Sequence, residues 1–337
     1  MAPTPSGYLH LGNVFSFAVT AALARRCGAE ILLRIDDLDR ERVQREYVED
    51  IFETFAFLEI PWDRGPRSLG EFERDWSQLH RMPLYREALS RLREAGAVFG
   101  CSCSRAEVLR ASRDGGYPGT CVARGLGLDA VDVSWRLRTG AGGPVGAVGF
   151  GDAAGIGTGA GAGVGSGLGS AGPEVLWVMT YPAGSVETRL PVEMRDFVVR
   201  KKDGFPAYQL SSVVDDLHFG VDLIVRGEDL WASTLAQLYL SYPLGAVGFR
   251  DVRFYHHPLL TTAGGEKLSK SAGSTSIHYL RRQGLGAAEI YNLIAREVAG
   301  GAAGAVGAGE PSWAGGAAEV YDWAGLAALV LDVDREL

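Results

Sequence analysis

The sequence predicts an α/β fold, in which helices pack against a parallel sheet, and three observations support this class. Short apolar runs such as 31–35 are typical of buried strands, while stretches such as 14–26 and 47–58 have helical character. Strands and helices alternate along the chain, an order that usually produces parallel pairing. Of the 46 glycines, 22 lie in two tracts, 140–172 and 299–316, which interrupt an otherwise ordinary globular composition.

The individual elements follow from local composition and spacing. A first helix is predicted over 14–26, with Asn13 as its N-cap, because asparagine is a favoured capping residue. Further helices are expected at 47–58, 85–94, 233–242 and 287–298. Strands are expected at 31–35, 190–199, 212–216 and 222–226. Near the end of the chain, 323–331 is an apolar segment. The tract 140–172 is predicted to be a flexible insertion, because glycine costs backbone entropy and offers little apolar surface in return.

Composition and charge exclude several classes of protein. No run of about 18 apolar residues is present, so no membrane span is expected, and without a visible leader pattern the cytoplasm is the expected location. The net charge of −8 excludes a globally basic nucleic-acid-binding protein, although local basic faces at 40–45 or 200–202 stay possible. The four cysteines are too few for a disulfide scaffold, and three lie between 101 and 121, which indicates a metal site.

The first motif with a chemical meaning is the segment 2–13, Ala-Pro-Thr-Pro-Ser-Gly-Tyr-Leu-His-Leu-Gly-Asn. Its prolines and glycines shape a tight loop that opens into the first helix, and a helix N-terminus is a ready anion site. His10 can donate a hydrogen bond to a phosphate oxygen, and Gly12 leaves room for a nucleotide to approach. The alternative is a capped turn that binds no ligand.

The second motif is Glu-Lys-Leu-Ser-Lys-Ser at 266–271, which glycines precede and follow. Lys267 and Lys270 can neutralise the charge that builds on a triphosphate while a bond to its α-phosphorus forms. The alternative is a solvated basic loop. Two adjacent histidines, His256 and His257, lack further ligands at suitable spacing, so they are predicted to be structural.

Taken together, His-Leu-Gly-Asn and Lys-Leu-Ser-Lys-Ser resemble the paired signature motifs of the class I aminoacyl-tRNA synthetases. The surrounding sequence is similar to the glutamyl branch of that family. The segment 2–13 resembles its opening, 34–39 its Arg-Ile-Glu-Asp segment, and 225–230 part of its second half-sheet. The resemblance runs over roughly 2–138 and 190–298, and it implies a Rossmann-like class I synthetase catalytic domain.

Two features resemble one subfamily of that branch, the glutamyl-Q tRNA(Asp) synthetases. Only 66 residues follow Ser271, too few for the large helical anticodon-binding region of a glutamyl-tRNA synthetase. The spacing of Cys101, Cys103, Tyr117 and Cys121 is similar to the zinc motif of that subfamily. The resemblance therefore implies one structural Zn²⁺ held by three thiolates and the Tyr117 phenol. The alternative is three unrelated thiols.

The resemblance also implies roles for individual residues. The residues that would bind ATP are His10, Gly12, Asn13 and Lys270. The residues that would carry catalysis are His10, Gly12, Lys267 and Lys270, and Mg²⁺ is expected with the nucleotide. The residues that would bind glutamate are Ala2, Thr4, Asp36, Tyr208 and Arg226. This set makes chemical sense, because an acid suits the α-ammonium group and an arginine can pair with a carboxylate.

Two departures from the family pattern affect the expected glutamate site. Asp36 stands where the family usually has glutamate, so its contact with the ammonium group is expected to be longer or bridged by water. The family also has an arginine two residues before the Ala-Pro-Thr-Pro run, a position that falls before Met1. We therefore expect either a start further upstream or weakened glutamate binding.

The implied activity joins L-glutamate to ATP as glutamyl-adenylate and transfers the glutamyl group to queuosine in the anticodon of tRNA(Asp). The alternatives are a relative that charges a tRNA 3′ end and a non-catalytic RNA- or metal-binding paralogue. A monomer is expected. The expected parts are the first half of the catalytic domain, an insertion with the zinc knuckle, the second half, and the lysine loop with a helical C-terminal region, at 1–95, 96–189, 190–262 and 263–337.

Overall fold

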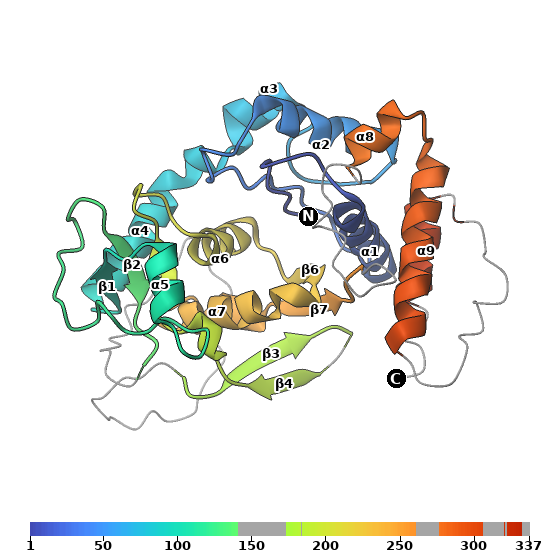
Figure 1. Cartoon of the computed structure of the whole chain (residues 1–337). Coiled ribbons are helices and arrows are strands. Elements are labelled where there is room, and N and C mark those ends of the chain that lie inside the picture. Colours follow the sequence, from blue (N-terminus) through green and yellow to red (C-terminus); the bar gives the residue numbers. More distant parts are fainter. Residues whose placement is uncertain (141–172, 183, 261–275, 306–319, 321, 332–337) are drawn as a thin grey trace, which may run out of the picture. The chain divides into compact units, whose positions relative to one another are not determined.

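The computed structural model describes residues 1–140, 173–182, 184–260, 276–305, 320 and 322–331 (Figure 1). The chain forms two compact units. The first comprises Met1–Arg81, Val225–Asp229 and His256–Leu337, and the second comprises Met82–Ile224 and Leu230–Tyr255. None of the helices that the structure describes is both long and apolar enough to cross a membrane. The predicted flexible insertion lies outside the described residues, apart from Gly140.

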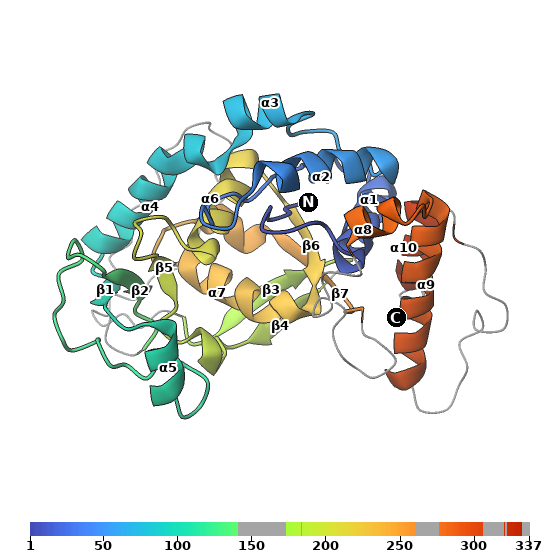
Figure 2. The same cartoon turned by 45° about the horizontal axis from the view of Figure 1, so that its top comes forward.

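The first unit is predominantly helical. Its helices are α1 (Leu11–Cys27), α2 (Arg45–Phe57), α3 (Leu69–Glu71), α8 (Ile277–Arg282), α9 (Ala287–Ala305) and α10 (Trp323–Leu331). A π-helical turn at Phe72–Trp76 and a 3-10 turn at Gln78–Arg81 follow α3. The helix α1 lies against α9 and α10 (Figures 1 and 2), and its residues are apolar on nearly every side, as expected of a buried helix. Helices were predicted over parts of α1, α2 and α9, and these are confirmed.

The helix α1 begins three residues earlier than predicted, and its N-cap is His10 instead of Asn13. The Nδ1 atom of His10 accepts a hydrogen bond from the Gly12 amide at 3.1 Å. Asn13 instead occupies the N3 position, where its side-chain oxygen accepts the His10 amide at 3.0 Å. The prediction of Asn13 as the cap was wrong because a histidine ring nitrogen can also accept the first free amide, which leaves asparagine to complete a reciprocal capping box.

The segment 31–35 is extended and buried, but it forms only one isolated parallel bridge, between Leu32 and Arg64. On its other side, the Arg34 amide donates to the Met1 carbonyl and the Asp36 amide donates to the Pro3 carbonyl. This is the hydrogen-bond spacing of a parallel pair. The N-terminal ammonium group of Met1 returns one bond to the Leu32 carbonyl at 2.7 Å, but the next two return bonds cannot form because Pro3 and Pro5 have no amide hydrogen. The predicted strand is therefore extended chain that bonds to Arg64 on one side and to Met1 and Pro3 on the other, without the full set of hydrogen bonds of a β-ladder.

The second unit contains a three-stranded antiparallel sheet in the order β1-β2-β5. Its strands are β1 (Val98–Cys101), β2 (Ser134–Leu137) and β5 (Val198–Arg200). A four-stranded sheet has the order β4-β3-β7-β6, in which β3 pairs antiparallel with β4 and parallel with β7. Its strands are β3 (Leu176–Thr180), β4 (Ser185–Thr188), β6 (Leu223–Gly227) and β7 (Arg253–His257). The three-stranded sheet is thus antiparallel and the four-stranded sheet is mixed, so the prediction of a parallel sheet was wrong for most of the described pairings.

The helices of the second unit are α4 (Met82–Glu94), α5 (Arg105–Ala111), α6 (Tyr208–Phe219) and α7 (Trp231–Ser241). The predicted strand at 212–216 lies inside α6, so this prediction was wrong. Leu210, Val213 and Val214 are buried at helical spacing, and a run as short as Ser-Val-Val-Asp-Asp does not by itself distinguish a strand from a buried helix. Of the predicted strand at 190–199, only the end becomes β5. The predictions that correspond to α4, β6 and α7 are confirmed, and the late apolar segment at 323–331 forms the helix α10.

Candidate functional site

The loop before α1 holds His10 in one defined tautomer. Because Nδ1 accepts the Gly12 amide, it carries no proton, so the neutral ring keeps its proton on Nε2. A side chain at Gly12 would crowd this ring, since a Cβ there would lie 3.0 Å from His10 Cε1. The first turn of α1 also contains no acidic residue to offset the positive end of the helix dipole. His10, Gly12 and Asn13 therefore combine an N–H donor with a helix N-terminus that favours an anion.

The predicted glutamate residues Ala2 and Thr4 flank Pro3, whose carbonyl accepts the Asp36 amide at 2.9 Å. The Asp36 carboxylate is itself held by Arg34, with Nε–Oδ1 at 2.7 Å and Nη2–Oδ2 at 3.2 Å. Both side chains of this bidentate ion pair are buried. Arg34 was not among the predicted site residues. Its signal was available, because residues two apart in an extended segment share one face.

Arg226 lies on β6, is buried, and stands beside His256. Burial, followed by the positive charge of Arg226, lowers the pKa of His256 to about 4. Burial also lowers the pKa of His257, whose ring packs edge-on against Phe15 with centroids 5.0 Å apart. Both histidines are thus held neutral near pH 7, and the packing of His257 is that of a structural histidine.

The structure says less about the remaining residues predicted to bind glutamate or ATP. Tyr208 is the first residue of α6 in the second unit, where 44% of its surface is exposed. Lys267 and Lys270 lie outside the described residues. The roles of Ala2, Thr4, Asp36, Tyr208 and Arg226 toward glutamate, and of His10, Gly12, Asn13 and the two lysines toward ATP, therefore stay predictions.

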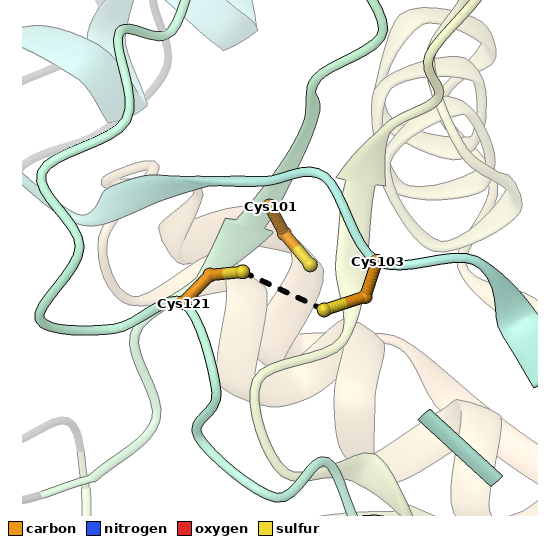
Figure 3. A group of neighbouring side chains, drawn as sticks. All are labelled: Cys101, Cys103 and Cys121. Carbon is orange, nitrogen blue, oxygen red and sulfur yellow. Dashed lines mark hydrogen bonds between the residues drawn. The ribbon is translucent and has the colours of Figure 1, made fainter. Parts of the chain in front are cut away.

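The three predicted cysteine ligands come together in the second unit. Cys101 ends β1, and the sulfur atoms of Cys101, Cys103 and Cys121 all lie within 4.8 Å of one another. Figure 3 shows the three side chains converging, with Cys103 Sγ and Cys121 Sγ 3.5 Å apart. The hydroxyl of Tyr117 lies 3.4 Å from Cys101 Sγ, so it joins the same cluster. Four tetrahedral ligands that bind one ion through bonds of about 2.3 Å need ligand atoms at this kind of separation.

The thiols of this cluster have pKa values that are shifted in opposite directions. Burial, together with the Cys121 thiol, raises the pKa of Cys103 to about 11. Burial opposes ionisation of Cys121, but the Ser102 amide and the groups of Tyr117 and Cys103 outweigh it and lower its pKa to about 6. Burial raises the pKa of Tyr117 as well. The cluster alone thus stabilises one thiolate, and a bound cation would favour the others.

Two contacts fix the Tyr117 ring. Its hydroxyl accepts the Cys121 amide at 2.9 Å, and the guanidinium of Arg136 lies 3.9 Å from the ring centroid. Ser134 on β2 donates to the Cys101 carbonyl at 3.0 Å and so ties the cluster to the sheet. Three sulfur ligands and a phenol oxygen in a fixed arrangement are a donor set suited to a soft or borderline cation such as zinc.

Comparison with known proteins places this chain in a family. The model of the tRNA synthetases class I (E and Q), catalytic domain, matches residues 1–121 and 183–302. A glutamyl-Q tRNA(Asp) synthetase of Nitratidesulfovibrio vulgaris is 34% identical over 310 residues, which are 88% of this chain and 84% of that protein. Glutamate–tRNA ligase 2 of Nitrosococcus oceani is 32% identical over 302 residues, 88% of this chain and 58% of the ligase.

A solved structure supports the fold. The crystal structure of glutamate-tRNA synthetase from Elizabethkingia anophelis aligns with a TM-score of 0.60 at 18% identity. The alignment covers 87% of this chain but 60% of that synthetase, so the chain spans about three fifths of its length. The family model covers well over half of the chain, and the relatives exceed 30% identity over most of it. The chain therefore belongs to the class I tRNA synthetases (E and Q), a family of ligases, and carries their catalytic domain.

Proposed function

We propose that the protein activates L-glutamate with ATP and transfers the glutamyl group to queuosine in the anticodon of tRNA(Asp). The observation that carries this choice is the cluster of Cys101, Cys103, Cys121 and Tyr117, the motif that resembles the queuosine-modifying subfamily. Several of the curated relatives bear the name glutamyl-Q tRNA(Asp) synthetase, which supports the same choice. We propose that the protein is a cytoplasmic monomer.

In the first step, a glutamate carboxylate oxygen attacks the α-phosphorus of ATP, and pyrophosphate leaves. The Nε2–H of His10 would bind a phosphate oxygen and the positive end of the α1 dipole would attract the phosphates, with Gly12 and Asn13 holding that geometry. Lys267 and Lys270 would neutralise the charge that develops as the bond to pyrophosphate breaks. Mg²⁺ would accompany ATP. The step needs no protein nucleophile, because positioning and charge stabilisation lower the barrier.

In the second step, a hydroxyl group of the queuosine ring attacks the glutamyl carbonyl carbon. AMP leaves, and the hydroxyl proton is released. Glutamate would be held by Ala2, Thr4, Asp36, Tyr208 and Arg226. The buried Arg34–Asp36 pair is suited to this task because it fixes the plane of the carboxylate that would meet the α-ammonium group.

The zinc site would have a structural role in this scheme. Cys101, Cys103, Tyr117 and Cys121 would hold one Zn²⁺, with all four positions occupied by protein. The surrounding sheet has only three short strands, so a metal ion would add stability that its small core does not supply.

The experiment that tests the proposal compares tRNA(Asp) from cells that make queuosine with tRNA(Asp) from cells that do not. We expect glutamylation of the first alone, with a product that survives removal of the 3′-terminal adenosine. Equal labelling of both tRNAs, lost with the terminal adenosine, would favour 3′-end charging, for which the likeness to glutamate–tRNA ligase 2 is the supporting observation. Absence of glutamate-dependent ATP–pyrophosphate exchange would favour a non-catalytic paralogue.

A further inference from the structure

The loop that carries His10 is held by Ser276 and Ile277, residues of the first unit that are distant from it in sequence. The Ile277 amide donates to the Leu9 carbonyl at 2.7 Å, and His10 forms an isolated antiparallel bridge with Ser276. Ile277 begins α8, which lies beside α2 in both views of the chain (Figures 1 and 2). The backbone just before α1 is therefore fixed by residues that belong neither to α1 nor to the predicted ATP motif.

A buried carboxylate on α2 completes this attachment. Asp50 is only 3% exposed, and its carboxylate accepts a hydrogen bond from the Leu9 amide. Two side chains of α8, His278 and Arg281, lie close to its Oδ1 atom. His278 Nδ1 is 3.4 Å from Oδ1, and Arg281 Nη1 is 3.8 Å from it. Asp50 thus links the peptide of Leu9 to α8.

The residue before Leu9 is held by aromatic contacts. The Tyr8 ring stacks on the His278 ring, with centroids 4.1 Å apart and an interplanar angle of 14°. On another side, Tyr47 of α2 meets Tyr8 edge-on at 5.0 Å. Tyr8, Leu9 and His10 are therefore each fixed by α8 or by the residue before it, and His278 contacts both Tyr8 and Asp50.

Stability alone does not account for this arrangement. Burial raises the pKa of Asp50 despite the opposing charges of His278 and Arg281 and the Leu9 hydrogen bond, so the site disfavours the charged carboxylate. A buried charge that its partners do not fully compensate is a cost to the fold. A polar group that is retained at a cost usually serves the geometry of a functional site.

We infer that Asp50 and His278 are positioning residues for His10. By fixing Leu9 and Tyr8, they set where the His10 ring and the N-terminus of α1 point, and so how well both meet the phosphates of ATP. This inference rests on the proposed role of His10 in ATP binding.

Asp50→Asn and His278→Phe test the inference, with Glu53→Gln as the matched control. Asparagine keeps the shape of Asp50 without its charge, and phenylalanine keeps the stack on Tyr8 without Nδ1. Glu53 lies one turn further along α2 and contacts the same Arg281, but its side chain is 61% exposed. The assay is glutamate-dependent ATP–pyrophosphate exchange, together with the increase in Tm that Mg-ATP produces.

We expect Asp50→Asn to lower kcat/KM for ATP about tenfold and His278→Phe about threefold, each with a smaller ATP-induced rise in Tm. KM for glutamate should change less than twofold and Glu53→Gln should behave as wild type, whatever fall in the ligand-free Tm follows from the loss of the Asp50 charge beside Arg281. Unchanged ATP kinetics in Asp50→Asn would overturn the inference. So would equal losses for ATP, glutamate and Tm, because these would indicate a merely structural role. If the wild type binds ATP but shows no exchange, the proposed function fails, and the ATP-induced rise in Tm still decides the inference.

Discussion

The loop around His10 and the cysteine cluster differ in how they hold their functional groups before a ligand arrives. The loop is fixed by backbone hydrogen bonds to segments distant in sequence, such as Ser276 and Ile277, and its donor is already in the required tautomer. The cysteine cluster draws its ligands from one short stretch, and its thiols have pKa values shifted in opposite directions. The first region is preorganised without a ligand, whereas the second needs a cation to be electrostatically complete.

The largest expected effect concerns the cysteine cluster. Cys103→Ser removes one of the four proposed ligands, about a quarter of the roughly 10–16 kcal/mol typical of structural zinc, so zinc affinity should fall about 70- to 900-fold. Metal analysis of the purified protein should find one zinc in wild type and none in the variant, with faster hydrogen exchange in β1 and β2. Cys27→Ser, which changes an exposed cysteine of α1, is the control and should keep its zinc. A wild-type protein without zinc would refute the site.

The His10 loop should respond in the opposite way, with loss of activity and little loss of stability. His10→Asn can still cap α1, since asparagine is a good N-cap, but it removes the Nε2–H donor. We expect kcat/KM for ATP in the exchange assay to fall about 100-fold, the usual loss when one preorganised donor is removed. The Tm and zinc content should stay near wild type. An unchanged rate would contradict the phosphate role, and a large fall in Tm would show that His10 matters mainly as a cap.

The same contrast explains what sequence reasoning found. The cysteine cluster could be predicted because its members lie within 21 residues and their spacing is visible. The motif that contains His10 was visible too, since prolines and glycines mark the turn before α1. The contacts that Asp50 and His278 make with the loop before α1 could not be predicted from the sequence, because residues so far apart in the chain meet only once it is folded.

The errors have an equally local origin. A short apolar run flanked by polar residues made 212–216 look like a strand, although the burial of Leu210, Val213 and Val214 follows a helix. The extended segment at 31–35 was correctly seen as buried, but the two prolines that limit its pairing belong to another segment. In both cases the deciding partner lay outside the window from which the element was predicted.

The unfolding free energy of the protein should depend on pH through His256, which belongs to the first unit. The pKa of His256 is about 4 in the folded protein and about 6.5 when unfolded, so between these values the unfolded chain binds a proton that the native protein does not. The stability from this group is present above pH 6.5 and is lost as the pH falls toward 4. His256→Gln should therefore reduce the loss of unfolding free energy between pH 7 and pH 5 by up to about 2 kcal/mol, measured by urea titration. The exposed His80 supplies the control His80→Gln, and equal pH profiles for both variants would count against this origin.

The smallest expected effect tests whether preorganisation extends to the proposed glutamate site. Arg34→Lys keeps a positive charge beside Asp36 but loses the two-pronged contact that fixes the carboxylate plane. We expect KM for glutamate in the exchange assay to rise about tenfold, about 1.4 kcal/mol, with KM for ATP unchanged. Arg42→Lys alters an exposed ion pair with Asp39 and should have no effect, since surface pairs contribute little. If Arg34→Lys instead weakens ATP and glutamate equally, the ion pair supports the extended segment as a whole, and orientation of the Asp36 carboxylate is not its specific task.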